Sequence, residues 1–139
     1  MRRMTLILAL AVLLAAAPSL CSAFESIEFV TQARAKELGM EIKVNAAGPD
    51  AVLIVLDFET KGELKSYDRA ALDMHDEGRL LLSSTLKEEK SPPGHIVVSF
   101  AADRKKLDTI ELKVVTFSGG ERTGHVLRIK EFVDLEKVR

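Results

Sequence analysis

Alternation of apolar and polar residues with a period of two constrains the fold of this chain more than any other feature. Met40, Ile42 and Val44 alternate with charged residues, the segment 110–114 repeats the pattern, and Ile96, Val98 and Phe100 again occupy alternate positions. Side chains of a β-strand point alternately to opposite faces, so this period indicates strands with one face toward a core and one toward water. The sequence therefore predicts a β-rich domain.

Turn-forming residues separate the predicted strands at short intervals. They occur at 47–50, 61–62, 76–78 and 119–120, and each of these segments contains glycine, which supplies the positive φ that tight connections need. The segment 76–78 has the composition of a hairpin loop. Such spacing is typical of short strands connected by tight turns.

One or two short helical turns are expected between the strands. Thr31 is placed to cap a helix over 32–38, and Gly39 follows at the position where a glycine ends a helix. Asp103 is placed to cap a single turn that reaches Leu107. Seven residues make at most two helical turns, so the first helix is a connector.

Eight or so strands with few helical turns indicate an all-β fold, an antiparallel β-sandwich of immunoglobulin-like or related Greek-key topology. Immunoglobulin domains of antibodies carry a cysteine pair and a packed tryptophan. This chain has one cysteine and no tryptophan, so the prediction concerns architecture alone.

The predicted core follows from the strongest apolar runs. The segment 51–58 is almost continuously apolar, which favours a central strand covered on both faces. The residues expected to be buried are Leu53, Val55, Leu82, Val98, Leu112 and Val114.

The first 23 residues have the form of a cleaved secretory signal peptide. Arg2 and Arg3 precede an apolar run of 14 residues, too short to span a bilayer of roughly 30 Å as a helix. Small residues end this segment, so we expect cleavage before Phe24 and export to the periplasm or the cell exterior. Cys21 raises the alternative of a lipoprotein, although Leu20 replaces the small residue that such sites prefer.

The remainder, 24–139, is expected to form a single β-sandwich domain. Its closing segment, 131–139, mixes charges of both signs and predicts a short mobile C-terminal tail. Without Arg2 and Arg3, this part carries 18 basic and 21 acidic residues. That balance argues against a nucleic-acid ligand, and no second apolar segment suggests a membrane span.

The best local group of metal ligands lies at the hairpin loop. Asp73, His75 and Glu77 share one face of a strand, with Asp76 beside them, and carboxylate and imidazole groups bind divalent cations. The spacing has no EF-hand form, and a solvated polar hairpin explains the same residues. These three residues are therefore weak metal candidates, weighed against an ordinary exposed turn.

Other chemistries have less support. A three-histidine zinc site would need His75, His95 and His125 to converge. Tyr67 and Phe117 are the aromatic residues best placed to stack against a sugar, and a core position explains both. No catalytic pattern and no cofactor motif stands out, so we expect a protein that is not an enzyme.

The functional expectation is an exported, non-catalytic binding or structural module with a protein partner in the cell envelope. The loop 88–94 is the expected contact surface, because its two prolines lower the entropy cost of binding. The alternative is a secreted protein that binds a small ligand or a divalent metal through the 73–77 hairpin.

Overall fold

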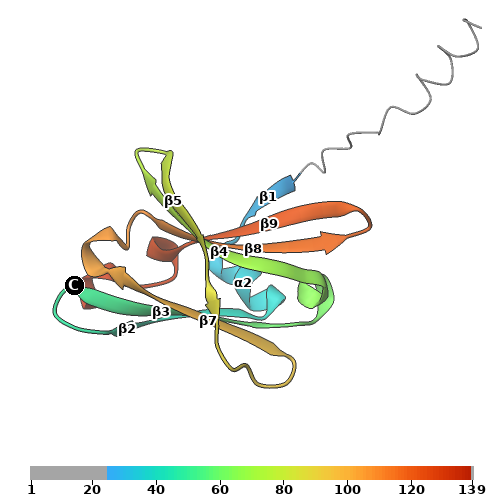
Figure 1. Cartoon of the computed structure of the whole chain (residues 1–139), viewed down its shortest axis with the longest axis horizontal. Coiled ribbons are helices and arrows are strands. Elements are labelled where there is room, and N and C mark those ends of the chain that lie inside the picture. Colours follow the sequence, from blue (N-terminus) through green and yellow to red (C-terminus); the bar gives the residue numbers. More distant parts are fainter. Residues whose placement is uncertain (1–24, 139) are drawn as a thin grey trace, which may run out of the picture.

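Two β-sheets packed face to face make up most of the computed structural model, which describes residues 25–138 (Figure 1). The all-β sandwich predicted from the sequence is confirmed. The predicted signal peptide, its cleavage site and Cys21 lie outside the described residues. In chain order the elements are β1 (Glu25–Phe29), α2 (Gln32–Leu38), β2 (Met40–Ala46), β3 (Ala51–Glu59), the 3₁₀ turn η1 (Gly62–Ser66), β4 (Tyr67–Asp76), β5 (Arg79–Thr85), β6 (Lys87–Glu88), β7 (His95–Asp103), η2 (Arg104–Lys106), β8 (Ile110–Ser118), β9 (Glu121–Arg128), η3 (Ile129–Glu131) and α3 (Leu135–Val138).

The strands are divided between a five-stranded sheet and a four-stranded sheet. The five-stranded sheet has the order β1-β9-β8-β4-β5, and the four-stranded sheet has the order β2-β3-β7-β6. The chain alternates between them: α2, η1 and η2 each lie on a connection that crosses from one sheet to the other. Pairing is antiparallel except between β1 and β9, which run parallel. The first and last strands of the described chain are therefore neighbours.

Local signals placed the short helices correctly. The Thr31 hydroxyl accepts a hydrogen bond from the backbone N–H of Arg34, and Gly39 ends α2 with a φ of 73°. The Asp103 carboxylate likewise accepts from the N–H of Lys105 at the start of η2. Both caps satisfy backbone donors that a helix start leaves unpaired.

The core lies between the two sheets. Alternate residues of β3 point into it, and the predicted burial of Val98, Leu112 and Val114 is confirmed. The core also contains Val52, Ile54, Leu56, Phe58, Leu64, Ala70, Leu72, Leu107, Ile110, Leu127 and Ile129.

The predicted burial of Leu53, Val55 and Leu82 is wrong. Leu53 and Val55 lie on the face of β3 that points away from the other sheet, and they are half-buried. The continuous apolar run therefore belongs to a strand that is buried on one face only. Leu82 is 47% exposed, because it lies on β5, in the hairpin that projects beyond the packed sheets in Figure 1.

The C-terminal segment folds back onto the sandwich. Where the sequence suggested a tail, the structure has η3 and α3, and the partly buried Phe132, Val133, Leu135 and Val138 pack against the core. Within residues 25–138, every helix is too short or too polar to cross a bilayer.

Candidate functional site

The edge strand β5 is the most exposed apolar element of the structure. All seven of its residues are exposed, and Leu80, Leu81 and Leu82 are 55%, 52% and 47% accessible. β5 pairs with β4 along one side and is the last strand in its sheet. Its other backbone edge, with N–H and C=O groups in the sheet plane, has no strand partner among the described residues.

A β-bulge shapes this strand. Leu82 lies opposite Met74 and Leu80 lies opposite His75, so Leu81 has no partner of its own on β4. Bulges bend a strand and increase its twist. The hairpin turns at Glu77 and Gly78, whose φ values of 48° and 78° fit the tight turn that the sequence predicts there.

The remaining edges differ in how far they are shielded. On the four-stranded sheet, β2 carries an ion pair of 3.1 Å between Lys43 and Glu41, and β6 is only two charged residues long. The large hydrophobic side chains exposed among residues 25–138 all belong to the five-stranded sheet: Ile27, Phe29, Leu80, Leu81, Leu82 and Phe117. All but Phe117 lie on its edge strands β1 and β5. Short strands, charged residues and β-bulges are the usual protections against unwanted pairing. β5 has the bulge at Leu81, but it is seven residues long and Arg79 is its one charged residue.

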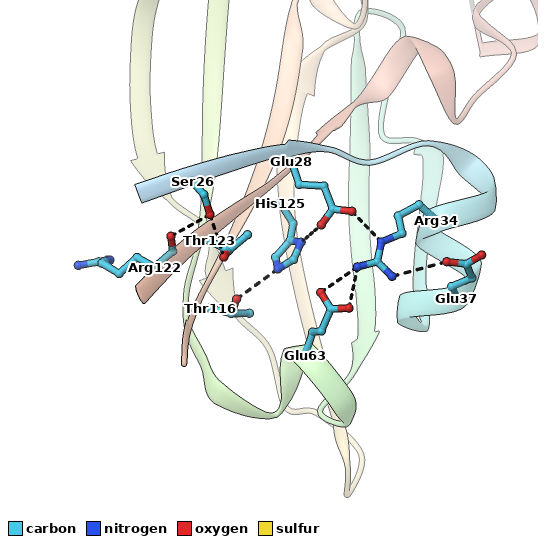
Figure 2. Close-up of polar contacts among 9 residues, drawn as sticks. All are labelled: Ser26, Glu28, Arg34, Glu37, Glu63, Thr116, Arg122, Thr123 and His125. Carbon is cyan, nitrogen blue, oxygen red and sulfur yellow. Dashed lines mark hydrogen bonds and ion pairs between the residues drawn. The ribbon is translucent and has the colours of Figure 1, made fainter. Parts of the chain in front are cut away.

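A polar cluster around the buried His125 joins β1, β8 and β9 to α2 and η1, as Figure 2 shows. His125 on β9 is 1% exposed, and its Nδ1 lies 2.8 Å from Oε2 of Glu28 on β1. Its Nε2 lies 3.2 Å from the hydroxyl of Thr116 on β8. Both imidazole nitrogens therefore have partners, as a buried histidine requires.

Arg34 joins this group to the connecting segments. Its Nε donates to Oε1 of Glu28 at 2.7 Å, and its Nη2 donates to both oxygens of Glu63 on η1 at 2.7 and 2.8 Å (Figure 2). The hydrogen bond from Arg34, supported by His125, holds the pKa of the Glu28 carboxyl below its usual value although burial opposes the shift. The same carboxylates raise the pKa of Arg34.

The cluster is connected like a catalytic triad and also like a metal site, but its surroundings disfavour both. Thr116, His125 and Glu28 follow the order of nucleophile, base and orienting acid, but Thr116 and His125 are 5% and 1% exposed, which leaves a substrate no access. Glu28, Glu63 and His125 place ligand atoms within 4.8 Å of one another. The guanidinium of Arg34 already supplies the positive charge between the two carboxylates. The arrangement therefore stabilises the fold by joining the crossover segments α2 and η1 to the five-stranded sheet.

Of the three metal candidates from the sequence, Asp73 and His75 each contact another side chain, and Glu77 lies in the hairpin turn. Asp73 accepts a hydrogen bond of 2.7 Å from the Ser83 hydroxyl, and His75 Nε2 lies 3.3 Å from Glu111. Glu77 forms the hairpin turn at the end of β4, beside Asp76. A surface hollow of about 560 Å³ adjoins this end and includes His75, Glu77 and Glu111 in its lining.

The histidines lie on different strands. His75 and His125 belong to the five-stranded sheet, whereas His95 belongs to the four-stranded sheet. His95 Nδ1 lies 2.9 Å from Asp57, so each histidine is paired with its own carboxylate. Tyr67 contacts Phe58 edge to face with ring centroids 5.1 Å apart, which agrees with a core role.

The loop 88–94 is held by several hydrogen bonds. Ser91 accepts from the N–H of Val97, the N–H of Glu89 donates to Val97, and the Ser99 hydroxyl donates to the Glu89 carboxylate. A loop fixed in this way offers a preformed surface, but it lacks the unpaired backbone of β5.

No family model matches this sequence, no curated protein is significantly similar to it, and no solved structure significantly matches its fold. The functional interpretation therefore rests on the geometry of the chain itself.

Sequence reasoning missed both the exposed edge strand β5 and the polar cluster around His125. Leu80–Leu82 had the composition of a core strand, and nothing local indicated that it lies at a sheet edge. The Glu28–His125 contact joins residues 97 positions apart. Glu28 fits the alternation of its strand, between the apolar Ile27 and Phe29, so no local signal pointed to this contact.

Proposed function

We propose that this protein is an exported, non-catalytic binding module that takes up an extended segment of a protein along the free edge of β5. The observation that carries the proposal is the strand itself: seven exposed residues, three consecutive leucines and an unpaired backbone edge. An added strand gains main-chain hydrogen bonds from such an edge, while neighbouring side chains provide selectivity.

The contrast between the two sheets supports this proposal. The four-stranded sheet ends in β2, which carries charged residues, and in the two-residue strand β6. Both features disfavour pairing of these edges with another strand. An apolar surface that stays exposed is typical of interaction sites. We therefore assign the binding role to β5 in preference to the loop 88–94.

The proposed location of the partner is the cell envelope or the exterior, in keeping with the signal peptide that the sequence predicts over the first 23 residues. The intact mass of the exported protein tests this part. It should correspond to a chain that starts at Phe24 and carries no lipid. A species that starts at Cys21 with added acyl mass would instead make the protein a lipoprotein.

Site-specific photocrosslinking in the exporting cell tests the binding surface. A photoreactive residue at Leu81 should give a covalent protein adduct, whereas the same residue at Lys43 on the shielded edge of β2 should not. A third position, Pro93, reports on the loop. The adduct at Leu81 should disappear when Leu82→Lys places a charge on β5. Absence of an adduct at Leu81, or adducts at Pro93 alone, would contradict the proposal.

A further inference from the structure

We infer that β1 is a releasable strand, which undocks from β9 as a unit while the rest of the sandwich stays folded. β1 lies at the end of the five-stranded sheet opposite to β5, so this inference does not depend on the proposed function (Figure 1). Among residues 25–138 its one strand partner is β9, along a parallel ladder from Glu25 to Phe29. Parallel pairing is slightly less stable per residue than antiparallel pairing.

β1 buries little apolar surface. None of its five residues is buried, and its two large apolar side chains, Ile27 and Phe29, are 53% and 57% exposed. The Phe29 ring contacts the guanidinium of Arg128 at 4.3 Å, and that group is itself partly exposed to water. None of the five residues belongs to the hydrophobic core or to the side chains packed against it. Because apolar burial is the dominant favourable contribution to folding, release of β1 leaves that contribution almost intact.

Polar and charged contacts provide most of the side-chain docking. Glu25 forms an ion pair with Lys113 on β8. The Ser26 hydroxyl lies 3.1 Å from the hydroxyl of Thr123 on β9 (Figure 2). Water can replace contacts of both kinds when the strand leaves, so their net contribution to docking is small.

The contacts of Glu28 follow the same rule. Its ion pair with Arg34 joins two side chains that are partly exposed while β1 is docked, and water and salt screen such pairs. The His125 nitrogen that faces Glu28 also faces the position that β1 vacates. Water can therefore take the place of the carboxylate, and release leaves no polar group without a partner.

The structure defines where the release ends. Val30 directly follows β1, is 2% exposed and belongs to the core, and its N–H donates to the carbonyl of Val126 at 2.8 Å. Thr31 then caps α2. An anchored residue and a capped helix hold the chain immediately after Phe29, so the opening is confined to β1. Release uncovers the edge of β9, at the opposite end of the sheet from the free edge of β5.

Amide hydrogen exchange at low concentrations of urea tests the inference on the folded protein. A local opening exposes little surface, so its free energy hardly depends on urea, whereas that of global unfolding depends on it steeply. The β1 amides bonded to β9 should have protection factors at least tenfold below those of β3, equal to one another and insensitive to urea. Protection equal to that of β3 with the same urea dependence would overturn the inference. Protection that rises progressively from Ser26 to Phe29 would mean that the strand frays, and would overturn it equally.

A disulfide across the ladder provides the matched control. Ser26 and Thr123 are direct partners in the register, so cysteines at both positions are placed to bond. The background carries Cys21→Ser, because Cys21 is the single native cysteine. Oxidised Ser26→Cys with Thr123→Cys should raise the protection of the β1 amides at least tenfold, and reduction should reverse the gain. Unchanged protection in the linked protein would show that exchange does not require separation of β1 from β9, which contradicts the inference.

Discussion

The imidazole of His125 and the carboxylate of Glu28 lie 2.8 Å apart because β1 and β9 pair in parallel with these two residues opposite each other. The contact joins the first strand of the described chain to the last. Arg34 extends it to α2, and Glu63 extends it to η1. One polar cluster thus links β1 and α2, near the start of the described chain, to η1 and to the last strand, β9.

The depressed pKa of Glu28 predicts a dependence of stability on acid. A carboxyl whose pKa is lower in the folded state than in the unfolded state binds fewer protons when folded, so its contribution is present above the unfolded value of about 4.3 and is lost as the pH falls through the folded value. Glu28→Gln should lower the free energy of unfolding at pH 7 and flatten its decline between about pH 5 and pH 3. Urea titrations at each pH measure this effect. The exposed Glu41→Gln is the matched control and should retain the wild-type decline.

Removal of Arg34 should destabilise the fold and change its response to metal ions. Arg34→Ala leaves Glu28 and Glu63 without their cation, at a cost on the order of 1 kcal/mol because the group is partly exposed to water. Zn²⁺ should then raise the melting temperature of the variant, since two carboxylates and His125 become available as ligands.

The wild-type protein should not respond to Ca²⁺ or Zn²⁺ in the same assay. An ion at tenfold excess over its dissociation constant would stabilise the folded state by about 1.4 kcal/mol. If the wild-type melting temperature rises, and Asp73→Ala with Glu77→Ala abolishes the rise, the hairpin is a metal site after all.

Two leucines on β3 should differ sharply in their contribution to stability. Leu56 is 1% exposed in the core, whereas Leu53 lies half-buried on the opposite face. Leu56→Ala should cost about 2–5 kcal/mol, and Leu53→Ala should cost well under half of that. Chemical denaturation of both variants measures the difference. Equal losses would mean that the outward face of β3 is covered.

The parts of the fold that the sequence predicted are those that local chemistry determines. Thr31 and Gly39 mark the ends of α2, and Glu77–Gly78 forms the predicted turn, because caps and turns depend on a few adjacent residues. The face of β3 was not determined locally. A continuous apolar run has no period that reveals which side packs.

The candidate site depended on non-local contacts and was largely missed. Leu82 was expected in the core because its neighbours are apolar, yet strand order places β5 at an edge. The Asp73–Glu77 segment was recognised as a hairpin, but its partners Ser83 and Glu111 come from neighbouring strands. Strand order is a property of the whole chain, and single-segment patterns do not contain it.

Amide hydrogen exchange along Arg79–Thr85 tests the central claim that the free edge of β5 is the binding surface. Successive N–H groups of a regular strand point to opposite edges, so alternate amides of β5 face outward on either side of the bulge at Leu81. In the complex isolated with its partner from the exporting cell, these outward amides should exchange slowly, whereas in the chain alone they should exchange rapidly. Rapid exchange of the outward amides in the complex would contradict the account.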